Sequence, residues 1–206
     1  MDEEQQQSVL LLSGNNKFYD ELMACNFETR HLVINQDITE DLIDTICLYI
    51  FKWNLEDKDI PKEKRKKIYI YINSDGGDTV TGNMILSAIQ CSETPVVTIG
   101  LAKCSSMASY ILAAGSKRYC FPNTVVLYHD GSSGYYASSN KGKDIQKFYD
   151  NLDEILTRFL IKNTNMSEDF LEKIKDREYY MFAEEAKSLG IVDCIIGVDC
   201  GLDEIL

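Results

Sequence analysis

The chain has 206 residues, enough for one sizeable hydrophobic core but too few for two ordinary enzyme domains and a linker, so we expect one folded domain. Its 21 basic and 33 acidic residues give a formal net charge of −12, a field that repels nucleic acids and anionic membranes. No run of about 18 apolar residues exists, and Met1–Glu4 is acidic where a signal peptide would be basic. We therefore expect a cytoplasmic protein with no nucleic-acid partner and no membrane anchor.

The seven cysteines are spread along the chain, at positions 25, 47, 91, 104, 120, 194 and 200. Their count is odd and no two of them form a C-x-x-C pair, which argues against a disulfide framework and against a zinc site. We expect most of them to be small buried hydrophobic residues.

The first third of the chain predicts an arm, a strand and a helix. Residues 1–30 are polar and weakly patterned, as in a mobile arm or a segment that a partner orders. A short strand follows at His31–Ile34, and Thr39 is the expected N-cap of a helix whose apolar residues recur at helical spacing as far as Phe51. The segment Lys62–Lys67 carries mostly like charge and is typical of a solvated loop.

Strands and helices then alternate. Strands are expected at 68–72, 95–100, 119–121 and 125–128, with helices at 79–90 and from about 105 to 115. The first two strands are apolar on both faces, as in a sheet covered on both sides, and the last one ends at His129. This β-α-β-α order predicts an α/β fold with a largely parallel sheet.

The last third predicts a loop and a long helix. Residues 131–142 are rich in Gly, Ser, Asn and Tyr, which is typical of a mobile loop. Asp144–Lys162 predicts a helix with one apolar stripe, longer than a compact core needs and suited to an interface. Beyond it we expect a helix from Ser167, a connector at 176–182, a helix at 183–189 and a strand at 191–196. We therefore predict one folded domain at residues 31–196, followed by a C-terminal tail at residues 197–206.

Three segments together could carry acyl transfer, which needs a nucleophile, a base and donors for the oxyanion. Ser106 lies at a predicted helix start, where free amides and the helix dipole favour negative charge. The N–H of Met107 is one candidate donor, and Gly76 or Gly77 is a second, because a residue without Cβ lets the main chain approach closely. His129, one of two histidines in the chain, is the candidate base. Each feature alone is typical of a cap, a turn or a structural histidine, but their order favours the catalytic interpretation.

Several separated motifs occur in one order along the chain: Ile70–Gly77, Ser106–Ala108 leading to Leu112–Gly115, Pro122–Asn123 before His129, and Ala183–Ala186 with Gly190–Asp193. From about Arg30 to Ile196 this order resembles the proteolytic subunit of the ATP-dependent Clp protease. The resemblance implies a crotonase-like α/β fold and a serine endopeptidase that cleaves unfolded polypeptides through an acyl-enzyme. It also implies homo-oligomeric stacked rings joined through a protruding helix, an AAA+ unfoldase as partner, an N-terminal segment at the axial entrance, and no metal or organic cofactor.

The resemblance assigns a role to each candidate residue. Ser106 corresponds to the nucleophile, His129 to the base, and Gly77 with Met107 to the oxyanion donors. Glu178 falls at the third position of the triad, where the family has Asp, and its added methylene is expected to displace the carboxylate and reduce activity. Asp176 lies two residues earlier on a connector that is expected to be extended, so its side chain should point to the same side as that of Glu178. It is therefore the alternative third member of the triad.

Other departures from the family pattern leave alternatives open. Asp75 replaces the usual proline before the glycines, and Lys103 raises a Ser-Lys mechanism, although we expect this lysine to face solvent. Cys104 invites a thiol nucleophile but is better interpreted as packing. Alternative functions are a phage-type head-maturation protease of the same fold, a catalytically weak structural ring subunit, and the acyl-CoA branch of the crotonase-like fold, which has no need of the serine and histidine pair.

Overall fold

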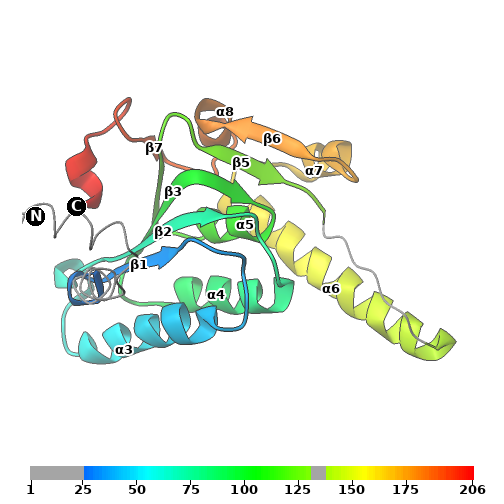
Figure 1. Cartoon of the computed structure of the whole chain (residues 1–206), viewed down its shortest axis with the longest axis horizontal. Coiled ribbons are helices and arrows are strands. Elements are labelled where there is room, and N and C mark those ends of the chain that lie inside the picture. The colour runs from blue at the N-terminus through cyan, green and yellow to red at the C-terminus, as the bar shows by residue number, and fades with distance from the viewer. Residues whose placement is uncertain (1–25, 131–137) are drawn as a thin grey trace, which may run out of the picture.

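The computed structural model describes residues 26–130 and 138–206. These residues form an α/β fold on one seven-stranded, largely parallel sheet (Figure 1). The strands are β1 (His31–Ile34), β2 (Ile68–Ser74), β3 (Val96–Ser105), β4 (Lys117–Cys120), β5 (Val125–Tyr128), β6 (Tyr179–Phe182) and β7 (Cys194–Ile195). Strands β1, β2, β3, β4 and β7 pair in that order, all parallel. The predicted fold class is confirmed.

Strand β3 changes its partner along its length, and this change builds the site described below. Its first half, Val97–Gly100, pairs with β4, whereas Lys103–Ser105 pairs with β5, also in parallel. Strand β6 then pairs antiparallel with β5. The carboxyl ends of β2, β3 and β5 therefore lie together, at the edge where open α/β sheets bind ligands.

Helices connect the strands and cover the sheet. They are α3 (Leu48–Glu56), α4 (Thr79–Cys91), α5 (Met107–Ala113), α6 (Ser139–Asn163), α7 (Glu168–Ile174) and α8 (Ala183–Ser188), with a π-helical turn η1 (Ile43–Cys47) and 3-10 turns η2 (Lys62–Lys64) and η3 (Leu202–Ile205). Helices α3 and α4 lie on one face of the sheet, and α6, which has 25 residues, extends away from the body (Figure 1).

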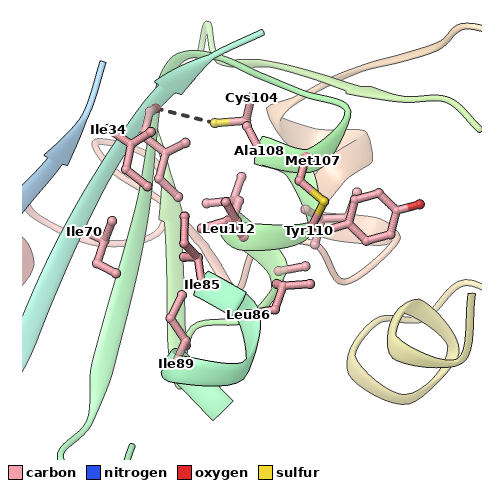
Figure 2. Close-up of a cluster of buried hydrophobic side chains, with 14 of the residues drawn as sticks. Ile34, Ile70, Ile85, Leu86, Ile89, Cys104, Met107, Ala108, Tyr110 and Leu112 are labelled. Atoms are coloured by element: carbon pink, nitrogen blue, oxygen red, sulfur yellow. Dashed lines mark hydrogen bonds between the residues drawn. The ribbon is translucent and has the colours of Figure 1, made fainter. Parts of the chain in front are cut away.

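Val96–Gly100 of β3 is buried on both faces, as predicted, whereas β2 alternates buried residues with the half-buried Tyr69, Tyr71 and Asn73. Ile68, Ile70 and Ile72 are fully buried on the side of α4 and α5, where Ile70 lies near Ile85 and Ile89 of α4 and Leu112 of α5 (Figure 2). On the opposite face a smaller cluster contains Val97, Ile99, Tyr119, Cys194, Ile196 and Ile205. Each fully buried isoleucine contributes about 1.5–3 kcal/mol, so this core fixes the strand ends that carry the site.

Several element boundaries differ from the prediction. Thr39 is not an N-cap: its hydroxyl hydrogen-bonds the Asp41 carboxylate, and the helical segment follows Leu42. The long helix begins at Ser139 rather than Asp144. Residues 26–29, assigned to the arm, are helical, and Phe27 stacks on Tyr49 at 4.4 Å. The rest of the predicted arm, and residues 131–137 of the predicted loop, lie outside the described residues.

The C-terminal part departs most from the prediction. Residues 179–182, predicted as connector, form β6. Cys194 and Cys200 form a disulfide, which the scattered cysteine pattern did not predict; the chain turns after β7 so that Cys200 pairs with Ile196, and the two cysteine Cα atoms lie 6.6 Å apart. The tail packs on the sheet, since the Tyr71 hydroxyl donates to the Ile205 carbonyl at 2.6 Å.

Within the described ranges, 26–130 and 138–206, no helix combines the length and the apolar character needed to cross a bilayer.

Candidate active site

Ser106 lies on a sharp turn between β3 and α5. Its backbone angles, φ 52° and ψ −126°, are unusual for a residue with a side chain. The Ser106 N–H donates to the Leu127 carbonyl of β5 at 2.8 Å, which fixes the turn to the neighbouring strand. A strained strand-to-helix turn of this kind exposes a serine hydroxyl at the sheet edge, as nucleophile elbows do. The side chain is partly exposed, and no hydrogen bond of its hydroxyl is found within the described ranges.

Gly76 and Gly77 lie beside this turn, with φ values of 97° and 145°. A Cβ on Gly76 would lie 2.7 Å from the Ser106 Cβ and 2.8 Å from the Ser105 carbonyl oxygen, so only glycine allows this approach. Directly after them, the Asp78 carboxylate accepts the Thr81 N–H at 2.6 Å and begins α4. The glycine turn is thereby held between β2 and a capped helix.

The backbone amides of this turn distinguish the two glycines. The Gly76 N–H donates to the Ser74 hydroxyl at 3.1 Å and is already used. The N–H groups of Gly77 and Met107 have no hydrogen-bond partner among the described residues. These are the two amides that can receive an oxyanion.

His129 and Glu178 face each other across β5 and β6. The last pair of this antiparallel ladder is Tyr128 with Tyr179, so the next residues, His129 and Glu178, lie opposite one another. Nδ1 of His129 is 3.0 Å from Oε1 of Glu178. Because an ionised carboxylate only accepts hydrogen bonds, Nδ1 carries the proton, and Nε2 is left free to act as a base.

The carboxylate of Glu178 does reach the imidazole. We expected its added methylene to displace the carboxylate, yet Oε1 of Glu178 lies 3.0 Å from Nδ1 of His129, within hydrogen-bonding distance. Asp176 is placed differently: its backbone is left-handed, with φ 56°, and its N–H donates to Oδ2 of Asp130 at 2.5 Å. The structure brings Glu178, and not Asp176, to His129.

Ser106 and His129 line one cleft of about 810 Å³, together with Met107, Tyr110, Tyr128 and residues of α6 and α7. The two side chains are not hydrogen-bonded to each other, a relaxed geometry common in catalytic sites without substrate. Burial and the charge of Asp130 raise the pKa of Tyr128 to about 12, so this hydroxyl stays protonated. Burial, with the charges of Asp130 and Asp150, also raises the pKa of Asp153 in the same cleft.

The two competing nucleophile schemes are not supported by the geometry. Cys104 is fully buried, burial raises the pKa of its thiol, and its Sγ lies 3.5 Å from the Ile72 carbonyl oxygen, the dashed line in Figure 2. Lys103 forms an ion pair with Asp75, so two departures from the family pattern neutralise each other. In the part of the chain that the structure describes, no three His, Cys, Asp or Glu side chains are grouped to hold a metal ion.

Sequence reasoning missed two residues that support this site. Ser74 engages the Gly76 amide, and Asp130 engages Asp176 and the Tyr128 hydroxyl. The position of Asp130, directly after the candidate base, was the available signal.

The family model described as Clp protease matches residues 13–199. The chain belongs to the Clp protease family. A protein from Pleurastrum terricola named "ATP-dependent Clp protease proteolytic subunit" is 30% identical over 177 residues, covering 85% of this chain and 87% of the relative. "ATP-dependent Clp protease proteolytic subunit 3" from Parasynechococcus marenigrum is 31% identical over 172 residues, covering 81% and 82%. As a member of the Clp protease family, the chain is a serine-type peptidase subunit, as the sequence motifs predicted.

Proposed function

We propose that this Clp protease chain is a catalytically active endopeptidase whose triad is Ser106, His129 and Glu178. The observation that supports it best is the 3.0 Å contact between Nδ1 of His129 and Glu178 in the cleft that Ser106 also lines. The contact leaves Nε2 as the basic nitrogen of an imidazole that lines the same cleft as the strained serine turn.

The reaction follows from this arrangement. When a polypeptide enters the cleft, Nε2 of His129 takes the Ser106 proton as Oγ attacks the scissile carbonyl. The imidazolium is stabilised by the Glu178 carboxylate and then protonates the leaving amine. Water, deprotonated by the same imidazole, releases the acyl group from Ser106.

The oxyanion of each tetrahedral intermediate is assigned to the N–H groups of Gly77 and Met107. Both amides are free of other partners within the described ranges, and the Met107 amide also has the helix dipole of α5 behind it. Removal of one such donor costs on the order of 100-fold or more in rate. No metal or organic cofactor enters this chemistry.

We further propose that the substrates are unfolded polypeptides and that 31–196 is the peptidase domain of a homo-oligomeric, stacked-ring assembly served by an AAA+ unfoldase. The relatives are named subunits of an ATP-dependent protease. The protruding α6 is the element proposed for ring contacts, because Phe148, Ile155 and Ile161 are exposed on it.

Labelling with a fluorophosphonate probe tests the proposal. Wild-type protein should be labelled and should hydrolyse peptides, and Ser106→Ala should lose both properties. Ser105→Ala is the matched control, because Ser105 is the neighbouring residue, is buried and has no catalytic role in the proposal. Absence of labelling in the assembled wild-type protein would identify a structural ring subunit instead.

A further inference from the structure

Glu178 lies at the surface, and one hydrogen bond does not hold it opposite His129. Its side chain is 56% exposed, and it is the first residue outside the ladder that β6 forms with β5. Solvent-exposed ion pairs contribute little to holding two side chains together, because water competes for both groups. A glutamate also has one more rotatable bond to immobilise than an aspartate. The site therefore needs a second contact that fixes the chain around Glu178.

Asp130 makes such a contact. Its Oδ2 accepts the Asp176 N–H at 2.5 Å, and its Oδ1 accepts the hydroxyl of the buried Tyr128 at 3.2 Å. Asp130 follows the base by one residue, and Asp176 precedes the acid by two. The carboxylate thus joins the end of β5 to the segment that leads into β6.

The backbone at Asp176 explains why an anchor is needed there. Helix α7 ends at Ile174 with Lys175 as its C-cap, and the next residue, Asp176, has a left-handed φ of 56°, which turns the chain toward β6. Such a conformation is uncommon for residues other than glycine and persists only where contacts hold it. The hydrogen bond from the N–H of this same residue to Asp130 supplies the contact.

We propose that Asp130 is a positioning residue for the reaction: it holds the turn at Asp176 and thereby fixes the Glu178 carboxylate against Nδ1 of His129. The proposal rests on the proposed serine-peptidase function. Asp130 does not act on the reacting atoms, and its effect is transmitted through Glu178.

Peptide hydrolysis by Asp130→Ala and Asp130→Asn, each in the wild-type and the Glu178→Gln backgrounds, tests this role. Loss of the acceptor lets Glu178 move by about 1 Å, which costs on the order of 100-fold, so Asp130→Ala should lower kcat by that factor with KM unchanged. Asp130→Asn keeps an oxygen acceptor for the Asp176 N–H and should retain kcat within about threefold. With Glu178→Gln already present, Asp130→Ala should cost less than about twofold more.

An activity-independent readout complements the kinetics. The chain has two histidines, so the imidazole ¹⁵N spectrum contains two sets of signals. Asp130→Ala should move the His129 signals away from a single Nδ1–H tautomer, and Asp130→Asn should not. Thermal unfolding of each variant identifies any that fail to fold. If Asp130→Ala does not fold, the kcat and the His129 signals of Asp130→Asn, compared with those of the wild-type protein, decide the test.

The outcomes separate the two proposals. Full kcat in Asp130→Ala, equal losses in Ala and Asn variants, or a loss that persists undiminished beside Glu178→Gln would overturn the role of Asp130. Peptide hydrolysis that survives Ser106→Ala would instead overturn the proposed function, whatever Asp130→Ala does.

Discussion

Glu178→Gln keeps the length and shape of the side chain but removes the charge that fixes the proton on Nδ1 of His129. An amide placed 3.0 Å from Nδ1 can donate to it, which stabilises the tautomer with the proton on Nε2, where it cannot act as a base. The equivalent change in a well-studied serine protease triad costs about 10⁴-fold in kcat, or roughly 5.5 kcal/mol of transition-state stabilisation. We expect a loss of this order.

The assay is hydrolysis of a fluorogenic peptide at saturating substrate, with Asp176→Asn as the matched control. Asn tolerates the left-handed backbone of residue 176, so this variant should fold and keep full activity. Glu178→Asp is informative as well: it withdraws the carboxylate by one bond, about 1.5 Å, and breaks the contact to Nδ1. Its activity should therefore fall rather than rise.

The opposite result is that Glu178→Gln retains kcat within a few-fold while Asp176→Asn loses it. That pattern would assign the third position of the triad to Asp176, in spite of its placement against Asp130.

Two further predictions concern the surroundings of Ser106, and a third concerns the ion pair of Arg30 with the buried Asp57, away from the cleft. Gly76→Ala places a Cβ 2.7 Å from that of Ser106 at a φ of 97°. Peptidase activity should fall at least 100-fold, and the free energy of unfolding, measured by chemical denaturation, should fall by about 1–3 kcal/mol. A fully active variant would contradict the predicted clash. The hydrogen bonds from Arg30 lower the pKa of Asp57 in the folded protein, so its stabilisation is complete at neutral pH and is lost as the pH falls below about 4. Asp57→Asn should therefore cost about 3 kcal/mol in urea unfolding at pH 7 and much less at pH 2, and an equal cost at both values would oppose this assignment. Cys104→Ala should keep its kcat within a few-fold, because the thiol is buried away from the cleft; a large loss would point to a role in the chemistry.

The parts of the fold set by local pattern were predictable. The apolar runs of β2 and β3 and the helical spacing after them identified the strand ends, and the serine, glycine and histidine motifs lie at those ends. Val96–Gly100 of β3 is buried on both faces and β2 on one, so the apolar pattern along the chain is strong enough to identify both strands.

The parts that depend on distant pairing were not predictable. Strand β6 is short and exposes Tyr180 and Phe182, so its sequence lacks the apolar pattern of a buried strand. It is a strand because it pairs with β5, which is distant in the sequence. The register of that ladder decides between Glu178 and Asp176, and spacing alone could not supply it. The Cys194–Cys200 disulfide likewise depends on a turn after β7 that composition does not reveal.

The order in which the site residues occur in the chain has a consequence for biosynthesis. In the proposed site the amides come from Gly77 and Met107, the base follows β5, and the acid precedes β6 in the last part of the chain. A nascent chain that stops before residue 178 contains the sequences of β1 to β5 but lacks Glu178, β6 and β7. In the proposed triad, His129 therefore gains its carboxylate partner only after residue 178 has been added and β6 has paired with β5.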